Sequence, residues 1–268
     1  MDSRDGTLRE RIDSVRDRIA AAAAQAGRDA REIALVAVTK HASMDQVREL
    51  IGLGHVDLGE NRVQQLVQRA AQVDEFLSRR RQLPESAGEG DHPTEVRWHM
   101  VGRLQRNKVR KAVDLSRLIH GVDSLRLAEE IQSVAVRREH PVEILVQVNV
   151  AGETAKGGVA PAAARHLVDQ IDTMVNVKPR GLMCMAPLGE GGEPDLDLAR
   201  RTFDRCRELF DDVRSAGSGG ERFDLLSMGM SGDFELAIAS GANLVRVGSS
   251  IFGDAPEAND DAEELDEH

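Results

Sequence analysis

The sequence predicts a single (β/α)8 barrel of the TIM type, with one helix before it and an acidic, disordered tail after it. Two observations predict this fold. Eight short apolar runs recur along the chain, and a stretch with helical apolar spacing follows each of them. The first run, residues 35–40, is almost free of polar residues, which is typical of a strand that is buried on both faces. An open doubly wound sheet is the alternative, but eight regular units without a break favour closure.

The individual elements are placed by apolar spacing and by turn residues. A helix over about residues 7–27 carries apolar positions three or four apart and ends at a glycine. The strands are expected at residues 35–40, 54–59, 96–102, 117–122, 144–150, 180–185, 225–228 and 244–247. The helices between them are expected at residues 43–53, from 60 onward, after 104, and at 124–138, 161–175, 197–216 and 233–240. Residues 83–95, rich in Pro, Gly and acids, predict an exposed loop.

Residues 1–253 are expected to form the barrel domain, and residues 254–268 the tail, which is too acidic to fold. The net charge of −11 argues against nucleic acid or an anionic membrane as a partner. No run is apolar enough to span a membrane, and the N-terminal segment carries no signal core. Two cysteines, Cys184 and Cys206, are too few for a metal cluster or a disulfide framework. We therefore expect a cytoplasmic protein without a metal.

Lys40 stands at the carboxyl end of the first predicted strand. A lysine is unusual there, because burying an unpaired ammonium group is costly. One interpretation is that its side chain snorkels out into solvent. The other is that burial favours the neutral amine, which can attack an aldehyde. The strand alone leaves both interpretations open.

The barrel itself favours the second interpretation, because active sites of this fold lie at the carboxyl ends of the strands. That rule brings together one set of polar and small residues on a single face. The set comprises Lys40, Asn61, the 102–108 loop, Asn149, Met230, Ser231, Gly248 and Ser249.

The loops after the seventh and eighth strands carry a second signal. In this fold they frequently form a phosphate site from backbone N–H groups, hydroxyls and a short helix. Gly229 and Gly248 allow the close backbone approach that such a site needs, although each turn alone is also an ordinary tight turn. Asp233 is expected to complement a helix dipole rather than bind a ligand, since a carboxylate repels phosphate.

A lysine opposite two phosphate-type loops suits a Schiff-base site for a phosphorylated aldehyde, and several segments resemble one family in order. They are LVAVTK, DLGENRVQ, WHMVGRLQRNK, VQVNVAGETAKGG, GLMCMAP and LSMGMSGDFELAIASGANLVRVGSSIFG. These segments resemble the pyridoxal phosphate homeostasis proteins, whose fold is similar to the barrel domain of alanine racemase. The resemblance covers about residues 7–253. The acidic insert near 84–95 and the tail depart from it.

The resemblance implies a role for each matching residue. Lys40 corresponds to the lysine that holds pyridoxal 5′-phosphate (PLP) as an internal aldimine. Ser231, Gly248 and Ser249 match the phosphate-binding turns, and the backbone of Met230 is expected to add a donor.

Two further residues carry less specific expectations. Arg246 is expected to face the pyridine nitrogen and to leave it unprotonated, because arginine is permanently charged and does not readily give up a proton. A salt bridge at the barrel rim is the alternative. Asn61 is expected to bind the cofactor, unless Glu60 and Asn61 instead cap a helix.

Other polar residues are expected to be structural. His99 is expected to be a hydrogen-bonded core residue, and Cys184 to be packed in the core. A basic cluster is expected to form a solvated helix face or to receive an anionic ligand. Its members are Arg103, Arg106, Lys108, Arg110 and Lys111.

The resemblance also implies what the protein does. Alanine racemase needs a tyrosine as a second base, supplied from an additional domain across a dimer, and this chain contains no tyrosine. We therefore expect a monomer that binds PLP, buffers it and delivers it to PLP-dependent apoenzymes without robust catalysis. A weak amino-acid racemase or transaminase-like enzyme with Lys40 as its only base is the alternative. A Schiff-base aldolase acting on a phosphosugar is a third candidate.

Overall fold

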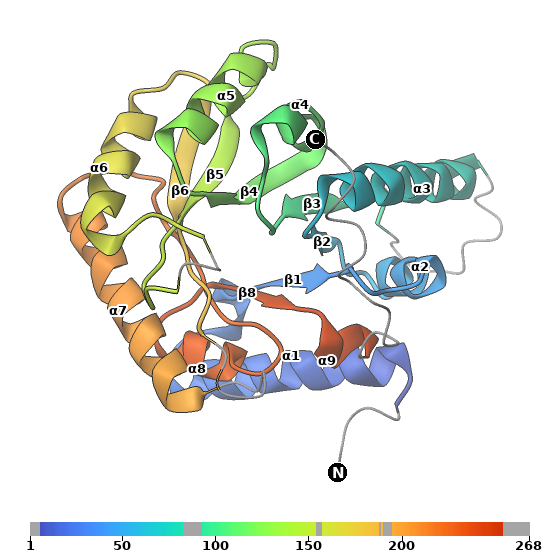
Figure 1. Cartoon of the computed structure of the whole chain (residues 1–268). Helices are drawn as coiled ribbons and strands as arrows, with labels where there is room; N and C mark the ends of the chain where they lie inside the picture. The colour runs from blue at the N-terminus through green and yellow to red at the C-terminus, as the bar shows by residue number, and fades with distance from the viewer. Residues whose placement is uncertain (1–5, 83–92, 154–156, 188, 190–194, 254–268) are drawn as a thin grey trace.

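The strands of the protein form one closed parallel barrel in which neighbours in sequence are neighbours in space (Figure 1). The computed structural model describes residues 6–82, 93–153, 157–187, 189 and 195–253. Closure is made by β1, which pairs with β2 on one side and with β8 on the other. The prediction of a (β/α)8 barrel is therefore confirmed, and the open sheet is wrong. The predicted tail, residues 254–268, and most of the predicted 83–95 loop lie outside the described residues.

In the part of the chain that the structure describes, eight strands and most of the helices lie close to the predicted positions, whereas the short helix after the last strand was not predicted. The strands are β1 (Ala34–Val38), β2 (Asp57–Glu60), β3 (Arg97–Met100), β4 (Ser116–Val122), β5 (Val142–Gln147), β6 (Val177–Met183), β7 (Leu225–Ser227) and β8 (Leu244–Val247). The helices are α1 (Leu8–Gln25), α2 (Met44–Gly52), α3 (Val63–Gln82), α4 (Val109–Leu115), α5 (Leu125–Ala135), α6 (Pro161–Asp172), α7 (Leu196–Ser215), α8 (Phe234–Ala239) and α9 (Ser249–Phe252).

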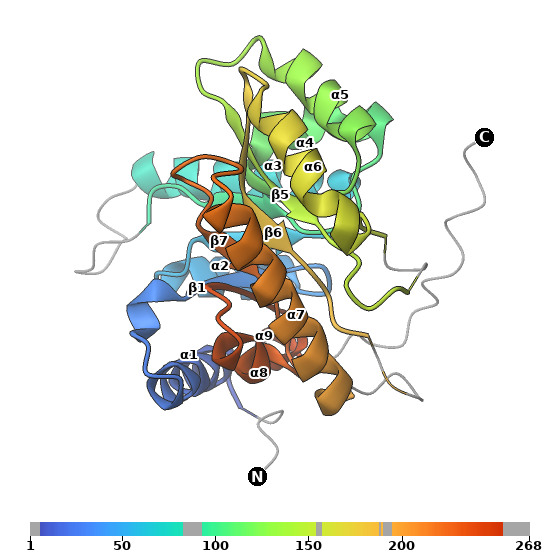
Figure 2. The same ribbon diagram turned by 90° about the vertical axis from the view of Figure 1, so that its left-hand side faces the viewer.

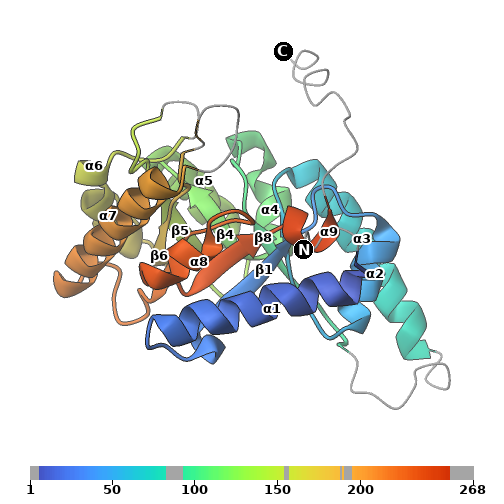
Figure 3. The same cartoon turned by 90° about the horizontal axis from the view of Figure 1, so that it is seen from below.

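The helix starts follow local side-chain chemistry. Ser43 caps α2, because its Oγ accepts from the N–H of Gln46 and the Gln46 side chain accepts from the N–H of Ser43 in return. Thr7 and Glu10 form the same reciprocal pair at the start of α1. The N-terminal helix then lies along α8 and α9 on the outside of the barrel (Figure 3).

Apolar side chains fill two separate regions of the core. The larger region lies between the barrel and its helices, where α6 and α7 pack against the strands (Figure 2). It includes Cys184, as predicted, and also Cys206. The smaller region fills the barrel interior. It consists of Val36, Leu118, Leu145, Met183 and Leu244. The barrel is therefore a packed core rather than a pore.

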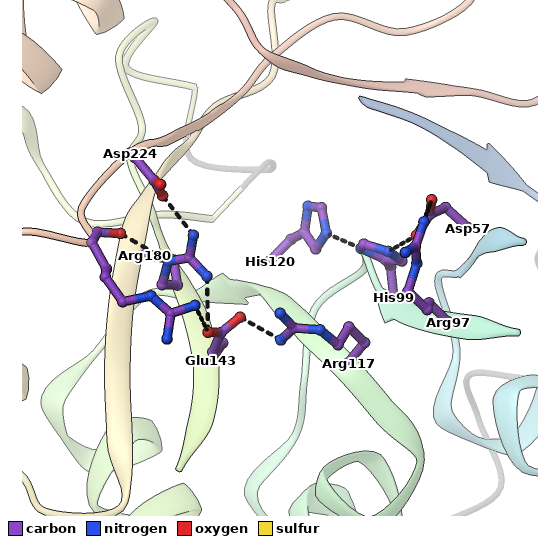
Figure 4. Close-up of polar contacts among 9 residues, drawn as sticks. Asp57, Arg97, His99, Arg117, His120, Glu143, Arg180 and Asp224 are labelled. Carbon is purple, nitrogen blue, oxygen red and sulfur yellow. Dashed lines mark hydrogen bonds and ion pairs between the residues drawn. The ribbon is translucent and has the colours of Figure 1, made fainter. Parts of the chain in front are cut away.

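An ion-pair cluster joins the amino ends of the strands (Figure 4). Glu143 of β5 pairs with Arg117, Arg180 and Arg222, and Arg180 also pairs with Asp224. Burial acts to raise the pKa of Glu143, but the neighbouring guanidinium groups outweigh burial and lower it. The cluster ties β4, β5 and β6 together on the side opposite the ligand face, where this fold places stability rather than catalysis.

His55 gives the fold a specific dependence on pH. Burial lowers its pKa to about 4, and its Nε2 lies 3.0 Å from the backbone oxygen of Asp57. In the unfolded chain His55 takes up a proton near pH 6.5, whereas in the folded protein it does so only near pH 4. Between these two pH values, His55 should therefore lower the free energy of unfolding by up to about 3 kcal/mol as the pH falls. His55→Gln should reduce that slope in urea unfolding, and exposed His140→Gln should leave it unchanged. Equal slopes for His55→Gln and the wild type would contradict this assignment.

Among the described residues, no helix combines the length and the apolar composition needed to cross a membrane.

The basic cluster follows β3. Four of its members are exposed: Arg103, Arg106, Arg110 and Lys111.

Candidate functional site

A cavity of about 500 Å³ opens at the carboxyl ends of the barrel strands. This size is within the range of sites for small molecules. Of the face predicted from the barrel, Gly102 lines the cavity, but Asn149 and the rest of the 102–108 loop do not. The lining includes all seven residues that the sequence assigns to the cofactor. These residues are Lys40, Asn61, Met230, Ser231, Arg246, Gly248 and Ser249. They come from the ends of β1, β2, β7 and β8, so the barrel collects side chains that are far apart in the sequence.

Lys40 lines this cavity from the turn after β1, and its side chain is exposed. The expectation that Lys40 is buried at the end of a strand is wrong. The strand ends at Val38, and Thr39 is the residue whose side chain turns into the protein. Lys40 therefore presents its amine to the cavity from a short turn.

Thr39, the residue next to Lys40, is fixed by a buried carboxylate. Its Oγ1 donates to Glu60 Oε1 at 2.5 Å, and its N–H donates to the oxygen of Gly59 at 2.9 Å. Arg69 of α3 lies 2.8 Å from the same Glu60 oxygen and donates to the oxygen of Ala42 at 2.7 Å. Glu60 and Arg69 thus hold the Lys40 turn on both sides, through Thr39 before it and Ala42 after it.

Glu60 was not expected in this role. It is the last residue of β2 and has no exposed surface, so the predicted part in capping a helix is wrong. Burial raises the pKa of Glu60, although Thr39 and Arg69 act in the opposite direction. The sequence carries no signal for this pair, because Glu60 stands between a predicted strand and a predicted helix and its inward orientation depends on strand register.

Asn61 is held beside the cavity by a close approach of two loops. A Cβ atom at Gly102 would lie 2.1 Å from the backbone oxygen of Asn61, so only glycine allows the loops after β2 and β3 to meet. The Oδ1 atom of Asn61 is buried and has no hydrogen-bond partner among the described residues. An unsatisfied buried acceptor at the edge of a cavity is available to a ligand that donates a hydrogen bond.

Ser231 joins the loops after β7 and β8. Its Oγ accepts from the N–H groups of Gly248 and Ser250, at 3.2 Å and 3.3 Å. The N–H of Met230 donates instead to Asp233 Oδ1 at 2.6 Å, so the structure does not leave that group free as the expected donor. Asp233 lies at the start of α8, as predicted, and its carboxylate orders the turn.

Arg246 lies on β8 inside the barrel and is only 5% exposed. Its Nη1 donates to Ser227 Oγ at 2.5 Å, and its Nη2 donates to the oxygen of Cys184 at 3.0 Å. Both acceptors are neutral, and no carboxylate of the described residues forms an ion pair with Arg246 within 4.0 Å, so a salt bridge at the rim does not account for it. Burial lowers the pKa of Arg246. A guanidinium group is thus fixed in the wall of the cavity.

Comparison with known proteins shows the family to which the chain belongs. The family model for the N-terminal domain of alanine racemase matches residues 11–256. The pyridoxal phosphate homeostasis protein of Aquifex aeolicus is 36% identical over 91% of this chain and 97% of its own length. The corresponding protein of Pseudomonas aeruginosa is 34% identical over 92% of this chain and 95% of its own length. The chain belongs to the pyridoxal phosphate homeostasis protein family.

Solved structures agree with this membership. The structure of PipY from Synechococcus elongatus with PLP bound is 31% identical in sequence to this chain, with a TM-score of 0.71. The match covers 92% of this chain and all of the PipY chain. A protein from Bifidobacterium adolescentis is 35% identical over 94% of this chain and 97% of its own, with a TM-score of 0.81. Alanine racemase of Clostridium difficile is 16% identical with a TM-score of 0.63, which shows a shared fold, and only 58% of that chain is covered. The resemblance predicted from the sequence is confirmed.

Proposed function

We propose that this protein binds PLP in the cavity at the carboxyl ends of its strands and acts in PLP homeostasis, as a buffer and a donor of the cofactor. The observation that carries the proposal is one cavity that combines an exposed lysine amine, a buried arginine and two hydroxyl-bearing loops. The bound PLP in the structure of PipY, a relative with the same fold, supports it.

The residues present fit the chemistry of this cofactor. When bound, PLP supplies an aldehyde for a primary amine and a ring that can withdraw electrons. Lys40 provides the amine. The hydroxyls of Ser231 and Ser249 take the phosphate, Gly248 lets it approach the backbone closely, Arg246 faces the ring nitrogen, and Asn61 adds an acceptor for the ring hydroxyl. The buried Asn61 Oδ1, which lacks a partner among the described residues, is the observation that favours a polar ligand here.

Phosphate anchoring can be tested at Ser249. Ser249→Ala should weaken PLP binding by about 1–3 kcal/mol, the range for losing a hydrogen bond to a charged group. Pyridoxal, which lacks the phosphate, should bind the variant and the wild type equally well in equilibrium dialysis. Ser133→Ala is the control, because Ser133 is exposed on α5 and does not line the cavity. Equal losses for PLP and pyridoxal would mean that Ser249 supports the fold rather than the phosphate.

We further propose that the protein is a carrier rather than an efficient enzyme, and that it acts as a monomer in the cytoplasm. The absence of tyrosine supports this, since the chain cannot supply the second base of alanine racemase. Arg246 supports it too, because a guanidinium group does not protonate the ring nitrogen, and an unprotonated ring is the weaker electron sink. Two free, buried cysteines suit a reducing compartment.

The carrier proposal is tested with protein loaded with PLP and freed of unbound cofactor by gel filtration. It should absorb visible light, restore activity to an added apo-aminotransferase, and elute as a monomer. It should racemise alanine far more slowly than about 1 per second, the lower end for ordinary enzymes. Racemisation at or above that rate without transfer would contradict the carrier and favour a racemase. Failure to retain any visible absorption would favour a Schiff-base aldolase.

The proposed position of Arg246 at the ring nitrogen predicts that Arg246→Glu accelerates exchange of the α-proton of a bound amino acid. A carboxylate at the ring nitrogen favours the protonated ring, so exchange of the alanine α-proton in heavy water should rise by about ten-fold or more, 1.4 kcal/mol in the barrier. Racemisation should stay slow, because no second base is added. Arg246→Gln, which keeps a hydrogen-bond donor without favouring a protonated ring, is the matched control. An Arg246→Glu variant that binds PLP without faster exchange would be inconsistent with this role.

A further inference from the structure

Below the cavity, five polar side chains form a continuous hydrogen-bonded chain across the interior of the barrel. Arg246 Nη1 lies 2.5 Å from Ser227 Oγ, and Ser227 Oγ lies 3.1 Å from His120 Nδ1. His120 Nε2 lies 3.0 Å from His99 Nδ1, and His99 Nε2 lies 3.1 Å from Asp57 Oδ1. Figure 4 shows the His120, His99 and Asp57 part of this chain. Its members come from β8, β7, β4, β3 and β2, so the chain spans the barrel.

These residues are buried among apolar side chains. Ser227 and His120 have no exposed surface, and His99 is 6% exposed. Leu118 and Leu145 belong to the same barrel interior. Polar groups in such surroundings are costly unless every one of them is hydrogen-bonded, so this arrangement is a built feature rather than an incidental contact.

The carboxylate end sets the direction of the hydrogen bonds. Asp57 only accepts, so His99 donates to it from Nε2, and when Nε2 carries the only proton of that ring, His99 Nδ1 accepts from His120 Nε2. The other nitrogen of His120, Nδ1, then accepts from the hydroxyl of Ser227, whose Oγ also accepts from Arg246 Nη1. The chain therefore begins at a guanidinium group in the cavity wall and ends at a carboxylate at the far end of the barrel.

We propose that the other four members of the chain are positioning residues for Arg246: Ser227, His120, His99 and Asp57. They fix the Arg246 guanidinium group toward the cavity, and they orient a continuous row of dipoles from its positive charge to the Asp57 carboxylate. This inference rests on the proposed function, in which Arg246 faces the ring nitrogen of PLP. The orientation of Arg246 is then set by residues that never touch the ligand.

The charge states at the two ends agree with this arrangement. Burial acts to raise the pKa of Asp57, but hydrogen bonds from His99 and Arg97 outweigh it and hold the pKa well below its usual range. Arg97 donates to both Asp57 oxygens, at 2.7 Å and 2.5 Å. Burial and the nearby Arg246 charge lower the pKa of His120, which keeps that imidazole neutral, with one ring nitrogen free to accept.

The first test needs no cofactor. Long-range ¹H–¹⁵N spectra of the free protein report which nitrogen of each imidazole carries the proton. In the proposed chain, His99 and His120 should each carry a proton on Nε2 and none on Nδ1, with assignments taken from His99→Gln and His120→Gln. A proton on Nδ1 of either ring, or a doubly protonated ring, would reverse the chain and overturn the proposal.

The second test links the chain to the ring nitrogen. Ser227→Ala breaks the chain beside Arg246 and should weaken PLP binding by about ten-fold or more. It should barely change the binding of 1-deaza-PLP, in which carbon replaces the ring nitrogen. Leu118→Ala, an apolar change in the same barrel interior, controls for general loss of packing and should affect both ligands equally.

The outcomes separate this inference from the proposed function. A Ser227→Ala variant that loses affinity equally for both ligands would show that the chain supports only the fold, which overturns the positioning role. Wild-type protein that binds neither ligand would contradict the proposed function and the positioning role with it. The imidazole spectra would still decide the direction of the chain by themselves.

Discussion

Replacing Lys40 with alanine should remove the visible absorption of bound PLP and weaken its binding about 100-fold, or 2.8 kcal/mol. The reason is that, among the described residues, Lys40 provides the only lysine amine in the cavity lining, so the variant keeps the phosphate and ring contacts but cannot form a covalent bond. Binding is measured by equilibrium dialysis, because the spectrum no longer reports it.

Lys40→Arg is the matched control for this change. It keeps the positive charge of the side chain but cannot form the same linkage, so it should lose the visible band while holding PLP more tightly than Lys40→Ala. A Lys40→Ala variant with an unchanged band would show that another amine reacts. Equal affinity of the wild type and both variants would show that the covalent bond contributes nothing to retention of the cofactor.

Arg69→Ala should lower the free energy of unfolding by about 3–5 kcal/mol, the cost of leaving a buried charge without its partner. Glu60 has no exposed surface, and Arg69 is its ionic partner at 2.8 Å. The same change frees the oxygen of Ala42, so the Lys40 turn should also lose protection of its backbone amides from hydrogen exchange.

Arg79→Ala provides the comparison for Arg69, because Arg79 pairs with Glu75 on the surface of the same helix, α3. An exposed pair of this kind contributes about 0–1 kcal/mol. Urea unfolding at pH 7 should therefore separate the two variants clearly. Similar losses of stability would mean that Glu60 is neutral when buried and that Arg69 is not required to compensate its charge.

The barrel and the composition of its cavity follow from patterns that sequence reveals directly. Apolar runs mark each strand, and the parallel topology places all carboxyl ends on one face, which is why Lys40, Ser231 and Gly248 could be grouped before their contacts were known. His99 was correctly expected to be a hydrogen-bonded core residue. These inferences depend only on spacing and on the rules of one fold.

The contacts that orient the site depend on register, which spacing does not supply. Glu60 could equally start a helix or end a strand, and only the pairing of β2 with β1 and β3 turns it toward Thr39 and Arg69. The partnership of His99 with His120 needs a register shift between β3 and β4. The prediction that Lys40 is buried was wrong for a related reason. A shift of one residue at the end of a strand changes which side chain turns inward.

Borohydride reduction followed by peptide mapping tests the central claim most directly. The reagent reduces a carbon–nitrogen double bond between PLP and a lysine, and so fixes the cofactor to the residue that holds it. The label should be found on the peptide containing Lys40, in one equivalent per chain. A label on Lys108, Lys111, Lys156 or Lys178 instead, or no label on protein that has bound PLP, would contradict the assignment of the site.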